Sequence, residues 1–238
     1  MMKACADFHS HILPCVDDGS HSVEESLQML RMEAEQGVTH VVLTPHFYAK
    51  HDSPERFLQR RAAAWETLQA AMAGEEGLPQ ITLGAEVYYF PGISESEAVL
   101  RLTVGDSRFL MLEMPAMPWT ESMYREIAAI HQRYGITPII AHIDRYIGPF
   151  RTHGVLKRLE QLPVLIQANG SFFLQSGTAR MAMRMLRKKQ VHLLGSDCHN
   201  LQERRPNLGE TVAKIEKQLG SEVLAWIRSC ENIVLSHR

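Results

Sequence analysis

The sequence lacks the features that place a protein in a membrane, outside the cell or on nucleic acid. No apolar run approaches the roughly 20 residues that span a bilayer, and the amino terminus has no basic segment followed by the apolar stretch of a secretion signal. A net charge of −2 gives the chain no basic face for nucleic acid. We therefore predict a cytoplasmic protein without membrane insertion and without nucleic-acid binding.

Cysteine is also scarce, whereas the rest of the composition is ordinary. Cys5, Cys15, Cys198 and Cys230 form no C-x-x-C pair and are too few for a disulfide framework, so we expect reduced thiols. Apolar residues make up 45% of the 238 residues and charged residues 22%, which is enough for one substantial core. Since α/β barrels of about 250 residues commonly form one unit, we predict a single domain over residues 1–238.

Short β-type runs alternate with longer helical stretches along the chain. Ser22 followed by Glu25 is a capping box that predicts a helix start, and Gly37 ends that helix; Gly135 ends another, which covers 124–134. Strand, helix and strand repeated in this way favour right-handed crossovers and a parallel sheet. The predicted strands are 4–8, 38–43, 81–84, 109–112, 138–141, 164–168 and 191–195.

A polar residue follows each predicted strand. These residues are His9, His46, Glu86, Glu113, His142, Asn169 and Asp197. They are separated by 37, 40, 27, 29, 27 and 28 residues, about one βαβ unit each. Repeated units of this size favour a barrel, because closure brings every strand end to one mouth, where barrel enzymes carry their reactive groups. An open doubly wound sheet is the alternative, and it would spread the same residues along a line.

Several of these residues have the chemistry of metal ligands. His9 and His11 share one strand face, because side chains at i and i+2 do, and can act as a chelating pair. The stretches VVLTPH, GAEVYY, LMLEMP, IIAHIDRY and LLGSDCHN each place a histidine or a carboxylate after a buried-type strand. With Asp18 from the DDG that follows, the candidate ligands are His9, His11, Asp18, His46, Glu86, Glu113, His142, Asp197 and His199.

The size of this set predicts more than one metal ion. One transition-metal ion takes about four to six ligands, so the set predicts two or three divalent ions, and mixed imidazole and carboxylate ligands suit manganese, iron or zinc better than calcium or magnesium. Carboxylates this close repel one another without cations between them. A lone strand-end histidine is usually an ordinary polar residue, and any single member could orient a ligand instead. Members at so many strand ends, however, predict a multinuclear site.

These motifs resemble the PHP superfamily (polymerase and histidinol phosphatase), and within it the bacterial polysaccharide-operon branch of manganese-dependent protein tyrosine phosphatases. The resemblance covers almost the full length and rests on DFHSHILPCVDDG, EESLQMLRMEAEQGVTHVVLTPH, GAEVYY, PIIAHIDRY and GSDCHN followed by Arg204. H-x-H alone is common in metallohydrolases, but DDG, A-E-x-Y-Y and H-x-x-R-Y together point to this branch. The chain departs from the family at Asp144, where Glu is usual, and in FYAKHDSPERF after His46.

The resemblance implies an α/β fold, a distorted (β/α)7 TIM-like barrel of PHP type, with a metal site at the C-terminal ends of the strands. By position, the three ions implied would be held by His9, His11, Glu86 and Asp197; by Glu86, Glu113 and His142; and by Asp18, His46 and His199. It also implies two arginines that grip the phosphate. These are Arg145 and Arg204, with Arg205 as a substitute for the second.

The function implied is metal-dependent hydrolysis of phosphomonoesters, with a phosphotyrosine protein as the substrate. A hydroxide activated by the metals would attack phosphorus in line, and the planar groups of Arg145 and Arg204 match phosphate geometry. The phenolate leaving group has a pKa near 10, so no general acid is assigned, although His199 or Asp18 could help. The partner implied is a tyrosine kinase that regulates exopolysaccharide synthesis, and manganese is the expected metal, with iron or zinc as alternatives.

Rival interpretations stay open at this stage. Cys198 and Arg204 have the C-x5-R spacing of cysteine-dependent tyrosine phosphatases, but HNLQE between them is bulky and lacks a glycine for a phosphate cradle. Asp197 beside the thiol also disfavours a thiolate. A PHP phosphoesterase acting on a small monoester, such as histidinol phosphate or a nucleotide, would share fold and metals, and so would a metal-dependent amide or lactone hydrolase. A regulatory module without turnover usually loses ligands, and none of the set is missing here.

Three polar neighbours of the ligands have supporting roles in this interpretation. Asp17 is expected to shape the loop that brings Asp18 to the site, and Asp7, two residues before His9, could orient a ligand. Asn169 either contacts the substrate or a ligand, or forms a turn.

Overall fold

The computed structural model describes residues 6–147 and 154–236 of the chain. Ala4 and Cys5, which belong to the first predicted strand, lie outside these described residues. The strands are β1 (Asp7–Ser10), β2 (His40–Leu43), β3 (His46–Phe47), β4 (Gln80–Leu83), β5 (Glu86–Tyr88), β6 (Phe109–Glu113), β7 (Thr137–Ile140), β8 (Leu165–Asn169) and β9 (Leu193–Gly195). The α-helices are α1 (Val23–Glu35), α2 (Pro54–Met72), α3 (Glu121–Tyr134), α4 (Val155–Leu159), α5 (Gly170–Leu174), α6 (Ala179–Arg187), α7 (Leu208–Leu219) and α8 (Ser221–Ser236), and the 3-10 helices are Ile93–Glu95, Glu97–Arg101 and Ile143–Arg145.

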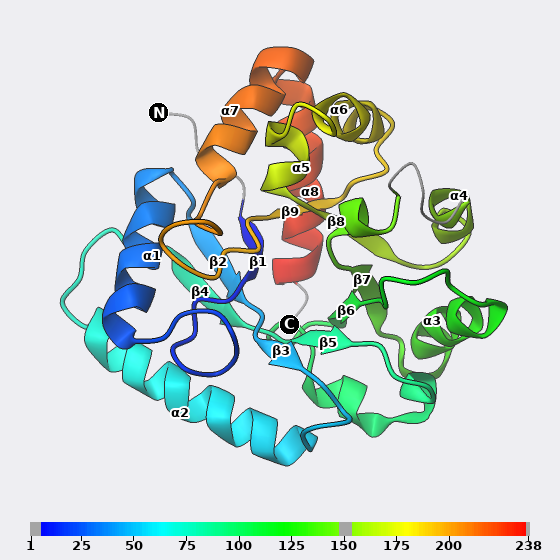
Figure 1. Cartoon of the computed structure of the whole chain (residues 1–238), viewed down its shortest axis with the longest axis horizontal. Helices are drawn as coiled ribbons and strands as arrows, with labels where there is room; N and C mark the ends of the chain where they lie inside the picture. The colour runs from blue at the N-terminus through cyan, green and yellow to red at the C-terminus, as the bar shows by residue number, and fades with distance from the viewer. Residues whose placement is uncertain (1–5, 148–153, 237–238) are drawn as a thin grey trace.

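All the strand pairs are parallel, and the sheet curls around one axis with the helices outside it (Figure 1). The strand order is β1-β2-β4 in one part and β3-β5-β6-β7-β8-β9 in the other. Backbone hydrogen bonds from Asp197 N to His9 O (2.7 Å) and from His11 N to Cys198 O (2.9 Å) connect the end of β9 back to β1. The residues after the strands therefore surround one mouth, as the barrel prediction required.

Two of the predicted strands, 38–43 and 81–84, are each followed after a short break by a second short strand, and these breaks distort the barrel. Pro45 lies between β2 and β3 and has no N–H to donate, and Gly84 and Ala85 separate β4 from β5. Because of these breaks, His46 and Glu86 open new strands instead of following the preceding ones. His9 likewise lies inside β1, since the strand continues to Ser10, beyond the predicted end at residue 8.

The helix ends follow the predicted local chemistry. The Ser22 side chain accepts a hydrogen bond from Glu25 N (3.1 Å), which caps α1, while the Glu25 carboxylate accepts from His21 N (2.8 Å). Gly37 follows the end of α1 with φ +80°, and Gly135 caps α3 with φ +65°, in the left-handed region that glycine tolerates.

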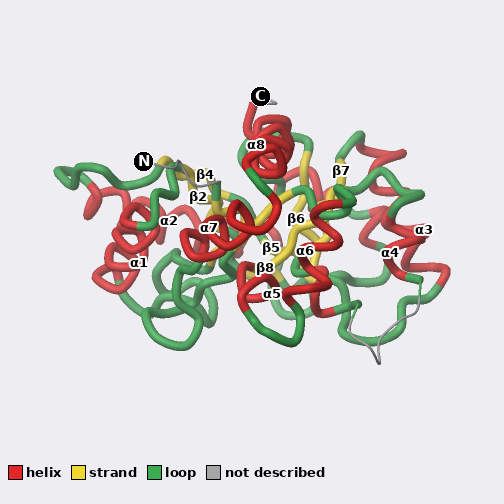
Figure 2. The backbone as a smooth tube through the Cα atoms, turned by 90° about the horizontal axis from the view of Figure 1, so that it is seen from above, coloured by secondary structure: helices red, strands yellow, loops and turns green. Residues whose placement is uncertain are grey.

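The amino ends of the strands enclose an apolar cluster that α8 covers. It includes Phe8, Met111 and Ile139 inside the barrel and Cys230 and Val234 from α8, all nearly or fully buried. Figure 2 shows α8 on one side of the sheet and the long loops on the other. This division leaves the carboxyl ends of the strands free for polar side chains.

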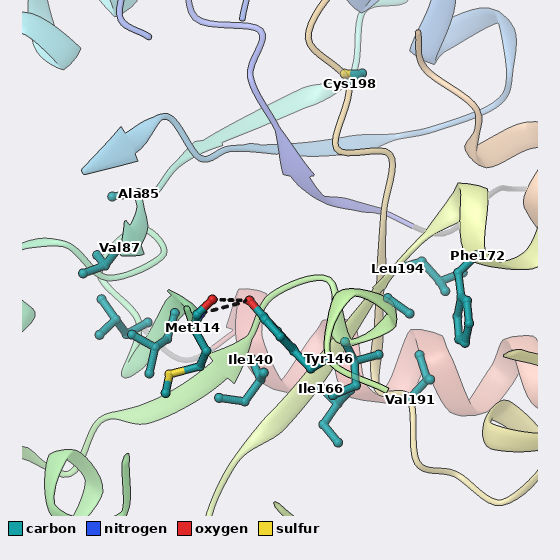
Figure 3. Close-up of a cluster of buried hydrophobic side chains, with 14 of the residues drawn as sticks. Ala85, Val87, Met114, Ile140, Tyr146, Ile166, Phe172, Val191, Leu194 and Cys198 are labelled. Atoms are coloured by element: carbon teal, nitrogen blue, oxygen red, sulfur yellow. Dashed lines mark hydrogen bonds between the residues drawn. The ribbon is translucent and has the colours of Figure 1, made fainter. Parts of the chain in front are cut away.

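A second, larger apolar cluster lies between the outer face of the sheet and the helices (Figure 3). Ile140, Ile166 and Leu194 contribute to it from neighbouring strands. The hydroxyl of Tyr146 donates to Met114 O (2.9 Å) and accepts from Met114 N (3.0 Å). This buried pair fixes the loop after β7 to the end of β6, and that loop carries the H-x-x-R-Y residues.

The structure bears on the membrane and disulfide predictions as well. Across residues 6–147 and 154–236 we find no helix with the length and hydropathy that crossing a bilayer requires. The described cysteines are free thiols: Cys15 is exposed, and Cys198 and Cys230 are buried.

Candidate metal centre

The mouth of the barrel brings all the predicted ligands together. Six of the strand regions contribute to them, and Asp18 arrives on the loop after β1. His9, His11 and His142 are fully buried, and Glu86 is 1% exposed. Charged and polar groups this deeply buried require partners, so their mutual distances decide what they can do.

The first predicted group has histidine nitrogens and carboxylate oxygens close to one another. His9 Nε2 lies 3.0 Å from Glu86 Oε2 and 3.7 Å from Asp197 Oδ1. His11 Nε2 lies 3.3 Å and 3.5 Å from the same two oxygens, and the two Nε2 atoms are 3.2 Å apart. Ligands about 2.1 Å from one ion lie about 3 Å from each other, so these atoms have the spacing of one coordination sphere.

The second group lies beside the first. His142 Nε2 is 2.8 Å from Glu86 Oε1 and 3.4 Å from Glu113 Oε1. His46 Nδ1 also approaches it, at 3.0 Å from Glu86 Oε2 and 3.9 Å from Glu113 Oε2. Glu86 therefore lies between the two groups, with Oε2 toward His9 and His11 and Oε1 toward His142.

The third group lies at the outer rim of the mouth. His46 Nε2 and His199 Nε2 are 3.5 Å and 3.6 Å from Asp18 Oδ1, and the Asp18 side chain is 67% exposed. Gly19 follows Asp18 in the sequence, and a Cβ atom there would lie 2.1 Å from His11 O. Only glycine therefore lets this loop pass close enough over His11 to present Asp18.

Both predicted arginines point into the centre. Arg145 Nη1 donates to Glu113 Oε1 (3.1 Å) and Nη2 to Asp197 Oδ2 (2.9 Å), and Arg204 Nη2 donates to Asp197 Oδ1 (2.8 Å). Arg205, the alternative to Arg204, instead pairs with Glu210 on α7 (3.2 Å), and its side chain is 55% exposed. Geometry thus places Arg204, not Arg205, at the site.

Two ligand candidates have backbone conformations that residues other than glycine seldom adopt. The φ angle is +30° for His142 and +54° for Asp197, both in the left-handed region. Such strain persists only where the surrounding structure holds it, and it concentrates at functional sites. The Asp197 backbone is held by its own N–H on His9 O (2.7 Å), so its conformation is tied to β1.

Asp7 and Asp17 support the candidate ligands from behind. The Asp7 carboxylate accepts from His9 N (3.0 Å), from Ser196 N (3.0 Å) and from Ser196 Oγ (2.5 Å), so it joins β1 to β9. Asp17 shapes its loop through Gly19 N (3.0 Å), as expected. Asp17 Oδ2 also lies 2.7 Å from His11 Nδ1 and accepts from His46 N (2.9 Å), a role that sequence reasoning did not assign.

Gln167 and Asn169 on β8 complete the support. Gln167 Oε1 accepts from His142 N (2.6 Å) and lies 3.2 Å from His9 Nδ1. Asn169 Nδ2 donates to Asp197 Oδ2 (2.9 Å), which favours the ligand-contact interpretation of this residue over the turn former. Sequence reasoning missed Gln167, although a glutamine two residues before Asn169 on the same strand face was the available signal.

Comparison with known proteins places the chain in a family. The family described as "Capsular polysaccharide synthesis, CpsB/CapC" matches residues 5–233. The chain belongs to this family. The family match confirms the resemblance found in the sequence.

Relatives and a solved structure extend this finding. The tyrosine-protein phosphatase CpsB of Streptococcus pneumoniae is 31% identical over 237 residues, 91% of each chain. The tyrosine-protein phosphatase YwqE of Bacillus subtilis (strain 168) is 24% identical over 230 residues, 91% of this chain and 86% of the relative. A crystal structure from work on YwqE and CpsB, described as unique metal-dependent tyrosine phosphatases, superposes with a TM-score of 0.85 at 21% identity, over 98% of this chain and 95% of that one. This match confirms the predicted fold.

The electrostatics of this CpsB/CapC member favour cations among the carboxylates. Burial opposes protonation of His11, but hydrogen bonds to Asp17 and Glu86 and their charges raise its pKa to about 10. Burial likewise opposes protonation of His142, but Glu113 and Glu86 raise its pKa to about 9. The carboxylates thus draw positive charge onto neighbouring imidazoles, and divalent ions would supply the same charge.

Two buried atoms of the candidate ligands also fit a metal, because no hydrogen bond satisfies them. His199 Nε2 and Glu113 Oε2 are buried and have no hydrogen-bond partner within the described residues. Burial, followed by the charge of His11, lowers the pKa of His199 to about 4, which keeps the ring neutral and able to bind a cation through Nε2. Mixed imidazole and carboxylate donors in this number suit transition-metal ions.

The cysteine alternative is not supported by this geometry. Cys198 is fully buried, and burial, followed by the charges of Glu33 and Asp7, raises the pKa of its thiol well above the ordinary value. Its side chain belongs to the outer apolar cluster (Figure 3). A nucleophilic cysteine needs the opposite conditions, namely access and a lowered pKa.

Proposed function

We propose that the protein is a metal-dependent phosphatase that hydrolyses phosphotyrosine in protein substrates. The observation that carries the proposal is the convergence of three imidazole–carboxylate groups beneath two arginines, in a chain whose family relatives are named tyrosine-protein phosphatases. Residues 1–238 act as one catalytic domain in this proposal, supported by the family match over 5–233.

The proposed centre holds two or three divalent ions, with manganese preferred over iron and zinc. The ligands are the nine predicted residues in their three groups, and Glu86 connects the first to the second. When bound, such ions lower the pKa of water from about 15.7 toward 7 and neutralise phosphoryl oxygens.

Other side chains of the protein bind the phosphoryl group and position the metal ligands. Arg145 and Arg204 lie at the mouth with donors on opposite oxygens of Asp197, and a phosphoryl group can take over these donors in a planar geometry that lysine lacks. Three polar side chains hold candidate ligands in place: Asp17 holds His11, Gln167 holds His142, and Asp7 holds His9. The ligand side chains therefore need little reorganisation during the reaction. The tyrosine phenolate, with a pKa near 10, departs without an assigned general acid.

The proposal extends to the partner and its location. The family description, capsular polysaccharide synthesis, supports a tyrosine kinase that regulates this synthesis as the substrate, dephosphorylated on a flexible tail. The cytoplasmic location predicted from the sequence stays a prediction.

The test is phosphate release from a phosphotyrosine peptide by metal-stripped protein, with manganese, iron or zinc restored one at a time. We expect activity to return with metal and to be lost in His142→Ala. The matched control is His21→Ala, an exposed histidine on the loop before α1, which should behave as wild type.

Other outcomes would point elsewhere. Activity that survived stripping but was lost in Cys198→Ser would overturn the metal mechanism. Turnover of histidinol phosphate or a nucleotide far above that of the peptide would favour the small-monoester phosphoesterase. Full metal loading without turnover of any ester would support the regulatory module.

A further inference from the structure

The outer surface between α6 and α7 carries a groove of about 870 Å³ with an unusual charge. Its lining includes Arg180, Arg184 and Arg187 of α6 and Lys214 and Gln218 of α7. Four of them are cationic and none is acidic. By contrast, the groove beside the metal centre has mixed charge. Its lining includes three aspartates and two arginines, namely Asp17, Asp18, Asp52, Arg56 and Arg60.

No ion pair neutralises the arginines of this groove within the described residues. No aspartate or glutamate occurs between Glu160 and Asp197 in the sequence. Within residues 6–147 and 154–236, Arg180, Arg184 and Arg187 form no ion pair with a carboxylate. Three arginines elsewhere on the surface form ion pairs, whereas the exposed Arg125 and Arg133 form none within the described residues either. Arg31 pairs with Glu75, Arg101 with Glu55 and Arg158 with Glu121.

Helix stability does not account for this arrangement. Arg180, Arg184 and Arg187 follow one another at i+4 and i+3, so their charges lie on one helix face and repel, at about 0.2–0.5 kcal/mol for each pair. Arg184 and Arg187 lie in the last turn, where the helix dipole favours cations. Arg180 lies in the first turn, where the dipole disfavours them. An anionic occupant would explain the whole set.

The groove begins on the same side of the barrel as the metal centre. Asn169 ends β8 at the mouth, α5 follows directly, and α6 then leads back to β9, so Arg180 is at the mouth end of α6 and Arg187 at the far end. Figure 1 shows α6 beside α5 and at the rim of the barrel. A chain that enters the mouth can therefore continue along this groove.

The shape of the groove favours a polypeptide over a bilayer surface. It is concave and bounded by two helices, and the apolar face of α6 is already used, since Ala182, Met183, Met185 and Leu186 are buried in the protein. An interfacial helix needs that face free to enter lipid. A cationic groove between two helices fits an extended chain that carries carboxylates.

We propose that the α6–α7 groove binds an acidic stretch of the protein substrate, at a distance from the phosphotyrosine. This inference rests on the proposed phosphatase function. Charge complementarity carries it: Arg180, Arg184 and Arg187 of α6 line the groove together with Lys214 of α7, whose Nζ also donates to Leu174 O (3.1 Å). Such a contact raises the affinity for the substrate and leaves the chemical step unchanged.

The experiment compares two phosphotyrosine peptides, one with an acidic segment and one with the same segment in its amide form (Gln and Asn). The metal-loaded full chain is tested as wild type and as Arg180→Gln/Arg184→Gln/Arg187→Gln. The control, Arg125→Gln/Arg133→Gln/Lys157→Gln, removes the same charge from α3 and α4, where the residues are also exposed. p-Nitrophenyl phosphate reports the chemical step, and fluorescence anisotropy reports binding of the acidic segment without its phosphotyrosine.

We expect the α6 variant to raise KM for the acidic peptide about tenfold, with kcat and p-nitrophenyl phosphate turnover unchanged, and to lose binding of the isolated segment. High salt should act on wild type in the same direction, since exposed charges are screened. Equal KM values for both peptides in wild type and variant, or binding of anionic vesicles or duplex DNA but not of the peptide, would overturn the groove assignment. If no phosphotyrosine peptide is hydrolysed at all while the segment still binds, the proposed function fails and the groove does not.

Discussion

The two ends of the same strands differ in what they bury. β6 shows the change within one strand: Phe109, Met111 and Glu113 share the inner face, and the first two belong to the apolar cluster beneath α8 while the third lies in the metal centre. All three are buried. The amino end removes apolar surface from water, whereas the carboxyl end buries charge, which costs stability unless each group is paired.

This difference teaches how the barrel divides its tasks. The amino end of the barrel, closed by α8, stabilises the fold. The carboxyl end holds charged groups in a fixed arrangement, and their burial lowers the stability of the fold. Substitutions at the mouth should therefore change activity more than stability, and substitutions under α8 should do the reverse.

Arg145→Lys is the strongest test at the carboxyl end. Lysine cannot reproduce the planar donors that contact both Glu113 and Asp197, so we expect kcat/KM for a phosphotyrosine peptide to fall about 100-fold to 1000-fold. The thermal unfolding midpoint should stay close to that of wild type. Arg205→Lys is the matched control, because Arg205 pairs with Glu210 away from the centre. A comparable loss in that control would contradict the division.

Ile139→Ala tests the amino end. Ile139 is fully buried in the cluster under α8, and truncating it leaves a cavity, so we expect a loss of about 2–5 kcal/mol in the free energy of unfolding. Urea unfolding followed by circular dichroism measures this loss. The folded fraction should keep its metal and its kcat. A specific loss of metal at full folding would show that the two ends are not independent.

Much of this architecture was predictable from the sequence. Every predicted strand region contains a strand, and the helix ends at Gly37 and Gly135 are correct, because hydrophobic runs and caps are local signals. The nine candidate ligands converge because parallel strands of a closed sheet present their carboxyl ends at one mouth. Their individual roles as ligands stay a prediction.

What could not be predicted depends on contacts between distant segments. The strands break at Pro45 and at Gly84 because the sheet divides there into two parts. His46 and Glu86 therefore begin new strands in the second part. Gln167 supports His142 across 25 residues, a pairing that no local pattern encodes. The choice of Arg204 over Arg205 likewise depends on the turn in which Asn200 Oδ1 accepts from Arg204 N (3.1 Å).

Asp7→Asn sharpens the comparison just behind the metal centre. Asp7 accepts three hydrogen bonds from His9 and Ser196, and an amide would turn a donor toward one of them. Partners of this kind cost about 10-fold to 100-fold in metal affinity when they are lost. Competition with a chelator, followed by metal analysis, measures this change. Retention equal to wild type would restrict Asp7 to a structural role between β1 and β9.

Glu33→Gln tests the smallest expected effect, which is on the pH dependence of stability. The Glu33 carboxyl is buried but belongs neither to the metal centre nor to the apolar cluster under α8. The Glu33 side chain on α1 is fully buried beside Asp7 and Cys198, and neither of its carboxylate oxygens has a hydrogen-bond partner in the described chain. Burial, followed by the charge of Asp7, raises the pKa of Glu33 well above the ordinary value. The folded protein therefore retains a proton that the unfolded chain loses above a pH of about 4.5.

Because the folded state binds more protons there, its stability must fall as pH rises, by at most about 1.4 kcal/mol per pH unit for one proton. Glutamine removes the titration and can donate to Asp7, so the variant should lose less stability than wild type between about pH 5 and pH 8. Urea midpoints across this range measure the slope. Glu35→Gln, on the exposed side of the same helix, should keep the wild-type slope, and a wild-type slope in Glu33→Gln would mean that another buried group holds the proton.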